Sequence, residues 1–81
     1  MTPKIGKIVI LALTGNQADE INSLNSTQVE TGQRVPVLVT KVHNHEIVNG
    51  QIILDGPLPL YWVKDITVGQ QLGQWRFPDE E

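Results

Sequence analysis

Apolar residues along this chain fall into short runs that are rich in valine and isoleucine and are separated by polar residues, glycine and proline. The three clearest runs are Val35–Val42, Ile47–Leu54 and Leu60–Val63. Short β-branched runs bounded by turn-forming residues are typical of consecutive antiparallel strands. Lys4–Leu13 predicts an earlier, first strand. Because this strand is continuously apolar from Ile8, both of its faces should be covered, either by a helix or by a second subunit.

One short helix is expected between the first two strands, from about Thr14 to Asn25. Thr14, followed three residues later by Gln17, has the spacing of a capping box, which satisfies two backbone N–H groups at the start of a helix. Three apolar residues recur at the spacing of one helix face: Ala18, Ile21 and Leu24. On the polar face, Asn22 is interpreted first as a solvated side chain, with ligand binding as the alternative.

The stretch His43–Glu46 predicts the tip of a hairpin between the second and third strands. Its two histidines and glutamate could also indicate a metal site, but without a further ligand cluster the solvated tip is preferred. Asn49-Gly50 is itself a hairpin signal, so direct pairing of Val42–Val48 with Gln51–Leu54 is a competing arrangement. We expect instead a β-bulge or a close backbone approach at Asn49–Gln51, within one strand.

Two further features concern the ends and faces of the strands. Pro36 cannot donate a ladder hydrogen bond, so the second strand should begin at a sheet edge.

Residues 54–59, with Asp-Gly and two prolines, predict a second turn, and Leu60–Val68 predicts the next strand. Strict alternation would place two sets of residues on opposite faces of that strand: Trp62, Lys64, Ile66 and Val68 against Tyr61, Val63, Asp65 and Thr67.

Together these patterns predict an all-β or β-rich fold, a small antiparallel sheet or barrel of four to five strands with one short helix. The expected layout is a single domain over residues 1–81, with the helix at about 14–25, the main sheet at about 35–68 and an aromatic C-terminal segment at 73–78. A chain of 81 residues is near the lower size at which one core holds a fold. Because the chain contains no cysteine, neither a disulfide nor a thiolate metal site can supplement this core. Self-association is the remaining way to bury more apolar surface, so we expect a homo-oligomer.

The net charge and the length of the apolar run Ile8–Leu13 limit which partners and which cellular location we expect. The formal net charge is −3, and six lysines and arginines are scattered along the sequence. Duplex nucleic acid normally requires a basic face, so it is not expected as a partner, whereas a small anionic ligand is compatible. The run Ile8–Leu13 is too short for a signal-peptide core or a membrane span. A cytoplasmic protein without a membrane partner is therefore expected.

All four aromatic residues follow residue 60: Tyr61, Trp62, Trp75 and Phe77. In one interpretation these rings plug one end of a small barrel. In the other, one or more rings form a stacking platform for a base. The candidate ligand-binding residues for the second interpretation are Trp62 and Trp75 for stacking, Arg76 or Lys64 for phosphate, and Asn22, Asn49 and Gln51 for ribose hydroxyls or base edges. Arg76 is preferred for phosphate because its planar guanidinium can bind two oxygens.

Several short motifs are spread over most of the chain: Leu13-Thr14, Gln17–Asn22, Val35–Val42, Val48–Gln51, Leu54–Gly56, the strand with Trp62, and Gly73–Pro78. Together they resemble the motifs of a family of small, uncharacterised accessory proteins from tailed phages and prophages. The chain departs from the family at Ser23–Asn25, where arginines are common, in a shorter connector before the second strand, and at Phe77, where a second tryptophan is common. The resemblance implies a phage accessory product in the cytoplasm of an infected bacterial host.

By analogy with other small phage proteins, the expected function is that of an anti-defence sponge, which binds and sequesters a nucleotide-derived immune signal of the host. A protein-interaction module that inhibits a host protein is the alternative, and its mark would be an exposed apolar patch without an enclosed pocket. A minor phage structural protein is a third class. The sequence shows neither a nucleophile with a base nor a catalytic carboxylate pair, so no enzyme, cofactor or metal is expected.

Overall fold

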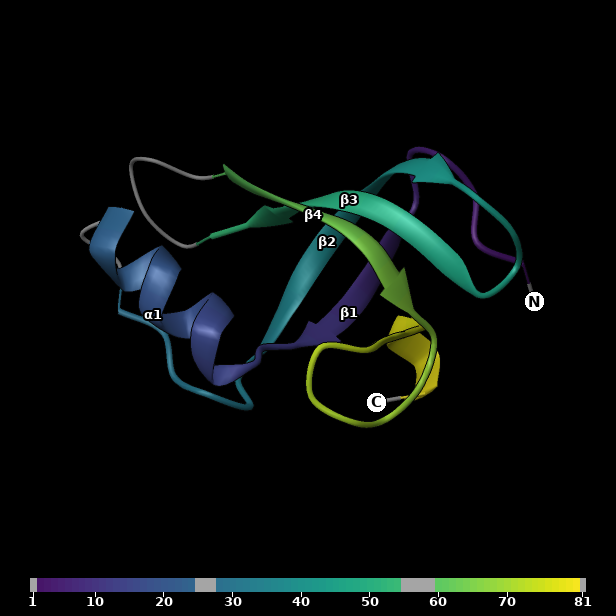
Figure 1. Cartoon of the computed structure of the whole chain (residues 1–81). Coiled ribbons are helices and arrows are strands. Elements are labelled where there is room, and N and C mark those ends of the chain that lie inside the picture. The colour runs from purple at the N-terminus through teal and green to yellow at the C-terminus, as the bar shows by residue number, and fades with distance from the viewer. Residues whose placement is uncertain (1, 25–27, 55–59, 81) are drawn as a thin grey trace.

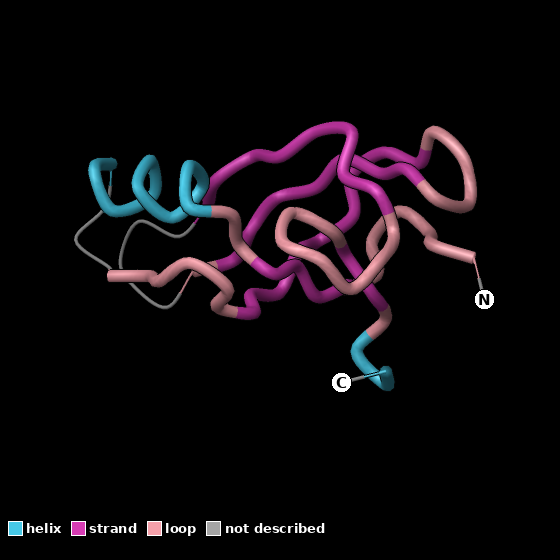
Figure 2. Tube along the Cα trace, turned by 60° about the horizontal axis from the view of Figure 1, so that its bottom comes forward, coloured by secondary structure: helices cyan, strands magenta, loops and turns pink. Residues whose placement is uncertain are grey.

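The computed structural model describes residues 2–24, 28–54 and 60–80, and five strands of one antiparallel sheet dominate it (Figure 1). The elements are β1 Ile8–Ala12, α1 Gly15–Leu24, β2 Arg34–Val42, β3 Ile47–Ile53, β4 Leu60–Thr67, β5 Trp75–Arg76 and the 3-10 helix η1 Pro78–Glu80. The strand order is β4-β3-β2-β1-β5, and the sheet curls into a half-barrel. Figures 1 and 2 both place α1 at the end of the molecule opposite the N-terminus. The predicted β-rich fold with one short helix is confirmed.

The hydrophobic core lies on the inner side of this curled sheet. Alternate strand residues supply it: Val9, Leu11, Val35, Val37, Val39, Val48, Ile52, Val63 and Trp75. From α1, Ala18 and Ile21 join the core, as their spacing predicts. The prediction is wrong for Leu24, which is the last residue of α1 and is 62% exposed.

The start of α1 is held by the predicted capping box. The Thr14 hydroxyl accepts a hydrogen bond from the Gln17 backbone N–H at 3.1 Å, and Gln17 Oε1 accepts one from the Thr14 N–H at 3.0 Å. Farther along the helix, the Tyr61 hydroxyl of β4 donates to the Glu20 carboxylate. Burial, together with this hydrogen bond, raises the pKa of Tyr61. The helix is therefore fixed to the sheet by polar contacts as well as by its apolar face.

The position of Pro36 corrects one prediction. Its strand, β2, is the central strand of the sheet and lies between β1 and β3. Pro36 is matched with Ile10 on the β1 side, while the paired register with β3 begins only at Val37. The proline is therefore tolerated because β2 has a paired neighbour on one side only at this point.

The competing arrangements around Asn49-Gly50 are resolved in favour of one continuous strand. β3 runs through these residues, and the hairpin tip lies at 43–46 between β2 and β3. Val39 is matched with Gly50 and Lys41 with Asn49, which leaves Thr40 as an extra residue in β2. A Cβ atom on Gly50 would overlap Val37 Cγ1 and lie 2.8 Å from the Leu38 carbonyl oxygen. The close backbone approach predicted within this strand is confirmed, whereas the extra residue of the bulge lies in the neighbouring strand β2 and not at Asn49–Gln51.

A second irregularity, in β4, corrects the predicted alternation of that strand. Val48 is matched with Ile66 and Gly50 with Val63, so Asn49 alone faces both Lys64 and Asp65. Asp65 has a φ of 54°, a left-handed conformation that aspartate adopts more readily than most residues. After the extra residue, the alternation of inward and outward side chains along β4 is shifted by one position. Val63 and Ile66 are therefore both buried. The prediction that they lie on opposite faces is therefore wrong.

The first strand is apolar on both faces, but the described chain covers only one of them. Val9 and Leu11 are fully buried, whereas Ile8, on the opposite side, is 38% exposed.

The predicted turn at 54–59 falls almost entirely outside the described residues. No described helix has the length and apolar character needed to cross a membrane.

The homo-oligomer stays a prediction, for which the uncovered side of β1 supplies apolar surface. Light scattering at micromolar concentration should give a mass that is a multiple of the 9.0 kDa chain. A mass equal to that of one chain would contradict it.

Candidate functional site

The outer side of the sheet, which faces away from the core, carries the candidate site. Residues that lie directly opposite each other in an antiparallel sheet share a face. One row therefore runs across four strands: Ile8 on β1, Leu38 on β2, Gln51 on β3 and Trp62 on β4. A neighbouring row contains Ile10, which is matched with Pro36 on one side and with Arg76 on the other. We call this side of the sheet the outer face.

Four of the seven candidate ligand-binding residues meet at one corner of the outer face. Gln51 lies opposite Trp62, and Asn49 is two residues from Gln51 on the same side of β3. Lys64 is two residues from Trp62 and faces Asn49 across the β4 bulge. We call these four residues, Asn49, Gln51, Trp62 and Lys64, the polar corner. Its ring is accessible, because Trp62 is 51% exposed.

Asn49 is the most firmly held residue of the polar corner. It is only 9% exposed, and its Oδ1 accepts hydrogen bonds from the Asp65 backbone N–H at 2.8 Å and from His43 Nε2 at 3.0 Å. The described residues supply no acceptor for its Nδ2. Because no buried side-chain nitrogen or oxygen among them lacks a partner, this NH₂ group reaches the surface. The Asn49 side chain is therefore fixed through Oδ1, and its Nδ2 is not fully buried.

His43 and Asp65 complete the surroundings of Asn49. His43 Nε2 lies 3.0 Å from Asn49 Oδ1 and 3.1 Å from Asp65 Oδ1. Two acceptors at one ring nitrogen require a hydrogen there, so in the neutral ring Nδ1 is the acceptor. Sequence reasoning missed this group, since His43 belongs to a tip interpreted as solvated. Only the bulge brings Asp65 toward Asn49, and a bulge of this kind has no sequence signal.

Trp75 has a different position from the one that ligand stacking requires. Its side chain is 0% exposed, its Nε1 donates to the Glu46 carbonyl oxygen at 3.1 Å, and its ring meets Phe77 edge-to-face at 5.1 Å between centroids. A ring without exposed surface offers no face to a base. The prediction of Trp75 as a stacking platform is therefore wrong, and the interpretation as a core plug describes it.

The two remaining predicted residues lie away from the polar corner. Asn22 is on α1, where its side-chain amide accepts from the Val29 N–H at 2.8 Å and donates to the Val29 carbonyl at 2.9 Å. This paired contact fastens the connector before β2 to the helix. Arg76 is on β5, which lies at the opposite edge of the sheet from β4. It shares the outer face with the polar corner but does not adjoin it.

The strands gather positive charge that is scattered in the sequence. Alternation and register place four of the six lysines and arginines on the outer face: Arg34, Lys41, Lys64 and Arg76. Most acidic residues of the described chain belong to α1, the connector, the hairpin tip and η1, among them Asp19, Glu20, Glu30, Glu46 and Asp79. Asp65 is the exception, because its exposed carboxylate lies beside Asn49 and contacts His43 Nε2 at 3.1 Å. A chain of net charge −3 therefore has a face of positive charge, which its linear sequence did not predict.

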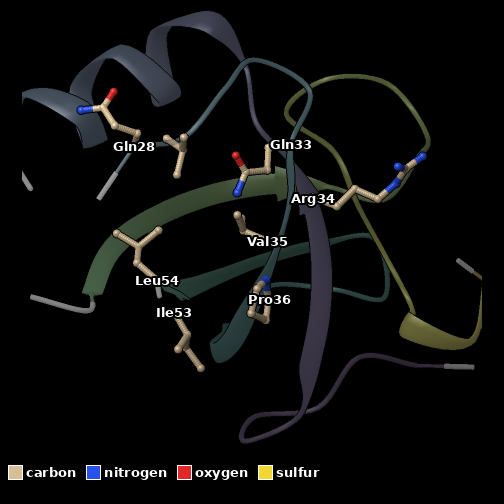
Figure 3. A pocket seen from close by; sticks show the side chains of 8 residues that line it. Gln28, Gln33, Arg34, Val35, Pro36, Ile53 and Leu54 are labelled. Carbon is tan, nitrogen blue, oxygen red and sulfur yellow. The ribbon is translucent and has the colours of Figure 1, made fainter. Parts of the chain in front are cut away.

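A hollow of about 400 Å³ lies at the start of β2, where its pairing with β3 ends (Figure 3). It is lined by Gln28, Val29, Gln33, Arg34, Val35, Pro36, Ile53 and Leu54. In Figure 3 the Arg34 side chain points away from the other labelled lining groups. None of the seven candidate ligand-binding residues lines it. The polar corner, where Trp62 is 51% exposed, is an open surface, and none of its residues lines this hollow or two smaller ones.

Comparisons with known proteins add no relative from which a role could be transferred to these residues. No protein family model, no curated protein and no solved structure matches the chain.

Proposed function

We propose that this protein is a binding protein without catalytic activity that captures a nucleotide-type ligand on its outer face. One observation carries the proposal: the strand register sets the half-exposed Trp62 beside Gln51 and near Asn49, with Lys64 next to it on β4. An exposed indole ring can stack on any base. Side-chain amides match base edges and ribose hydroxyls, and an ammonium group attracts phosphate.

The rigidity of Asn49 supports the same proposal. Hydrogen bonds from His43 and Asp65 fix its Oδ1, so the orientation of Nδ2, which is not fully buried, is set before any ligand arrives. Binding then costs little additional side-chain entropy at this residue. A preorganised donor next to an accessible ring is more useful for binding a flat ligand than for stabilising the fold.

The biological role that we propose is sequestration of a nucleotide signal in an infected bacterial cell. Its support is the motif resemblance to phage accessory proteins together with the small size of the chain. A sponge requires nanomolar affinity, roughly −12 kcal/mol, which an open corner on one chain does not readily provide. A second copy that covers the ligand would supply the missing enclosure, which links this role to the predicted homo-oligomer.

A protein-interaction module is the second candidate, because the outer face also carries aliphatic side chains. Ile8 and Ile53 are each 38% exposed, and Ile10, Pro36 and Leu38 lie between them on the same face. Exposed apolar residues rimmed by charge are typical of surfaces that bind another protein. In that case substitutions at Ile8 and Leu38, and not those at the polar corner, should abolish binding.

The test of the ligand-binding proposal is Trp62→Ala. Removal of one base stack should weaken the binding of ribonucleoside monophosphates by about 5- to 150-fold, because such a stack contributes about 1–3 kcal/mol. The melting temperature should change little, since Trp62 is already half-exposed. Calorimetric titration alongside thermal melts measures both quantities.

Leu72→Ala is the matched control, because Leu72 is 52% exposed and lies in the loop after β4. It should leave nucleotide binding unchanged. Equal binding by the Trp62→Ala variant and the parent chain would rule out the polar corner as the site.

A further inference from the structure

We infer that the outer face binds a single-stranded oligonucleotide several nucleotides long, which extends from the polar corner along β2 to Arg34. This inference rests on the proposed function, because it assumes that Trp62 stacks on a base. It goes further by assigning the length and the polyanionic character of the ligand. The placement of the cations, and not their number alone, leads to this conclusion.

The four cations lie at opposite ends of the outer face. Lys41 and Lys64 flank Asn49 at one end, since Lys41 is matched with Asn49 and Lys64 faces it from β4. Arg34, the first residue of β2, lies at the other end, with Arg76 nearby on β5. Lys41 and Arg34 are separated by the length of β2, in which Thr40 is the extra residue of the bulge. At about 3.3 Å per residue, their backbones are roughly 20 Å apart.

A mononucleotide is too short to contact both ends. A stacked strand advances by about 3.4 Å per nucleotide, so roughly six stacked nucleotides, or fewer when the strand is stretched, cover a span of 20 Å. Successive phosphates along such a strand would reach the lysine end and the arginine end together. For comparison, the OB-fold, one small β-barrel that binds single strands, covers about 4–16 nucleotides.

The surface between the two charged ends suits bases better than phosphates. It consists of Trp62 and Gln51, which belong to the polar corner, followed by the aliphatic side chains of Leu38 and Pro36 on β2. Unpaired bases present flat faces that stack on rings and contact apolar side chains without reading sequence. An acidic peptide is also complementary to positive charge, but it has no flat group for Trp62 and no use for the preorganised donor of Asn49. An oligonucleotide therefore matches more of the groups on this face than an acidic peptide does.

The test is a length series of fluorescently labelled oligouridylates, from the mononucleotide to the octanucleotide, followed by anisotropy with the full-length protein. Affinity should rise by at least about tenfold between one and six nucleotides and then level off, because the face becomes filled. With four phosphate contacts, the slope of log K against log salt should be about −2.8 for the hexanucleotide. This slope corresponds to a loss of about 50-fold between about 50 and 200 mM salt.

Variants in which one cation is replaced by a neutral residue test where the oligonucleotide lies on the outer face. Arg34→Gln should reduce the salt slope of the hexanucleotide by about 0.7 and leave binding of the mononucleotide unchanged. Lys4→Gln is the control with the same change in charge, because Lys4 lines a separate hollow with Thr2, Lys7 and Phe77. If Arg34→Gln alters the thermal melt, Arg76→Gln tests the same end of the face.

The outcomes separate this inference from the proposed function. A mononucleotide that binds as tightly as the hexanucleotide, with loss of both in Trp62→Ala, would overturn the oligonucleotide and leave the nucleotide site intact. Absence of binding to every member of the series would overturn both. Displacement of the hexanucleotide by a polyglutamate peptide of equal charge at equal concentration would also overturn the inference, because it would show attraction by charge alone.

Discussion

Replacement of Gly50 by alanine is expected to lower the free energy of unfolding by about 3 kcal/mol, the upper end of the usual cost of overpacking. Gly50 lies in the middle of β3, between the two bulges of the sheet. The added methyl group would overlap Val37 Cγ1 and lie 2.8 Å from the Leu38 carbonyl oxygen. The carbonyl belongs to the central strand and cannot move without breaking the pairing of β2 with β3.

Urea unfolding followed by circular dichroism measures this loss, with Gly15→Ala as the control. A Cβ at Gly15 would make only an ordinary contact, at 3.6 Å from Thr31 Oγ1, and alanine is favoured over glycine in a helix. That variant should be as stable as the parent or slightly more stable. A chain of this size is stabilised by roughly 4–12 kcal/mol, so the loss in Gly50→Ala should be plain. An unchanged midpoint would show that the strands are not as closely packed at Gly50 as described.

Trp75→Ala is expected to cost about 3–5 kcal/mol, the range for truncating a buried aromatic side chain. The ring is fully buried, and its indole N–H connects β5 to the hairpin tip through the Glu46 carbonyl. The same carbonyl accepts the Val68 N–H at 2.8 Å, so the hairpin tip, the end of β4 and β5 meet there. Removal of the ring would therefore loosen the closure of the half-barrel.

Thermal melts of Trp75→Ala and Trp75→Phe separate packing from hydrogen bonding at this position. Phenylalanine keeps much of the apolar contact with Phe77 but lacks the N–H, so its loss should be smaller than that of alanine. A Trp75→Ala chain that melts with the parent but no longer binds nucleotides would restore the stacking role that the buried ring contradicts.

Local signals predicted most of the fold. β-branched runs marked the main strands, the Thr14–Gln17 spacing marked the start of α1, and His43–Glu46 marked the hairpin tip. These features depend on neighbours within a few residues of each other, which a sequence displays directly. The errors arose where a residue depends on a distant strand. Pro36 is acceptable in the central strand only because β3 pairing starts one residue later.

The candidate site was predictable only in part, for the same reason. Residue type marked Asn49, Gln51 and Trp62 as possible ligand contacts, and the register brings them together. Whether Trp62 or Trp75 is accessible depends on the side of the sheet that each occupies, and two aromatic residues in separate strands do not reveal it. The bulge at Asp65 and the positive face both arise from pairing across strands. Neither has a signature in a linear sequence.

The central claim, that ligand binds to the outer face beside Trp62, is tested most directly by the two indole N–H signals in a ¹H–¹⁵N correlation spectrum. The chain has only two tryptophans, one half-exposed on the outer face and one fully buried, so each signal reports on one side of the sheet. Titration with a uridine hexanucleotide should shift the Trp62 indole signal, with the backbone amides of Asn49 and Gln51, and leave the Trp75 signal in place. A shift of Trp75 without Trp62, or shifts confined to α1, would contradict the account.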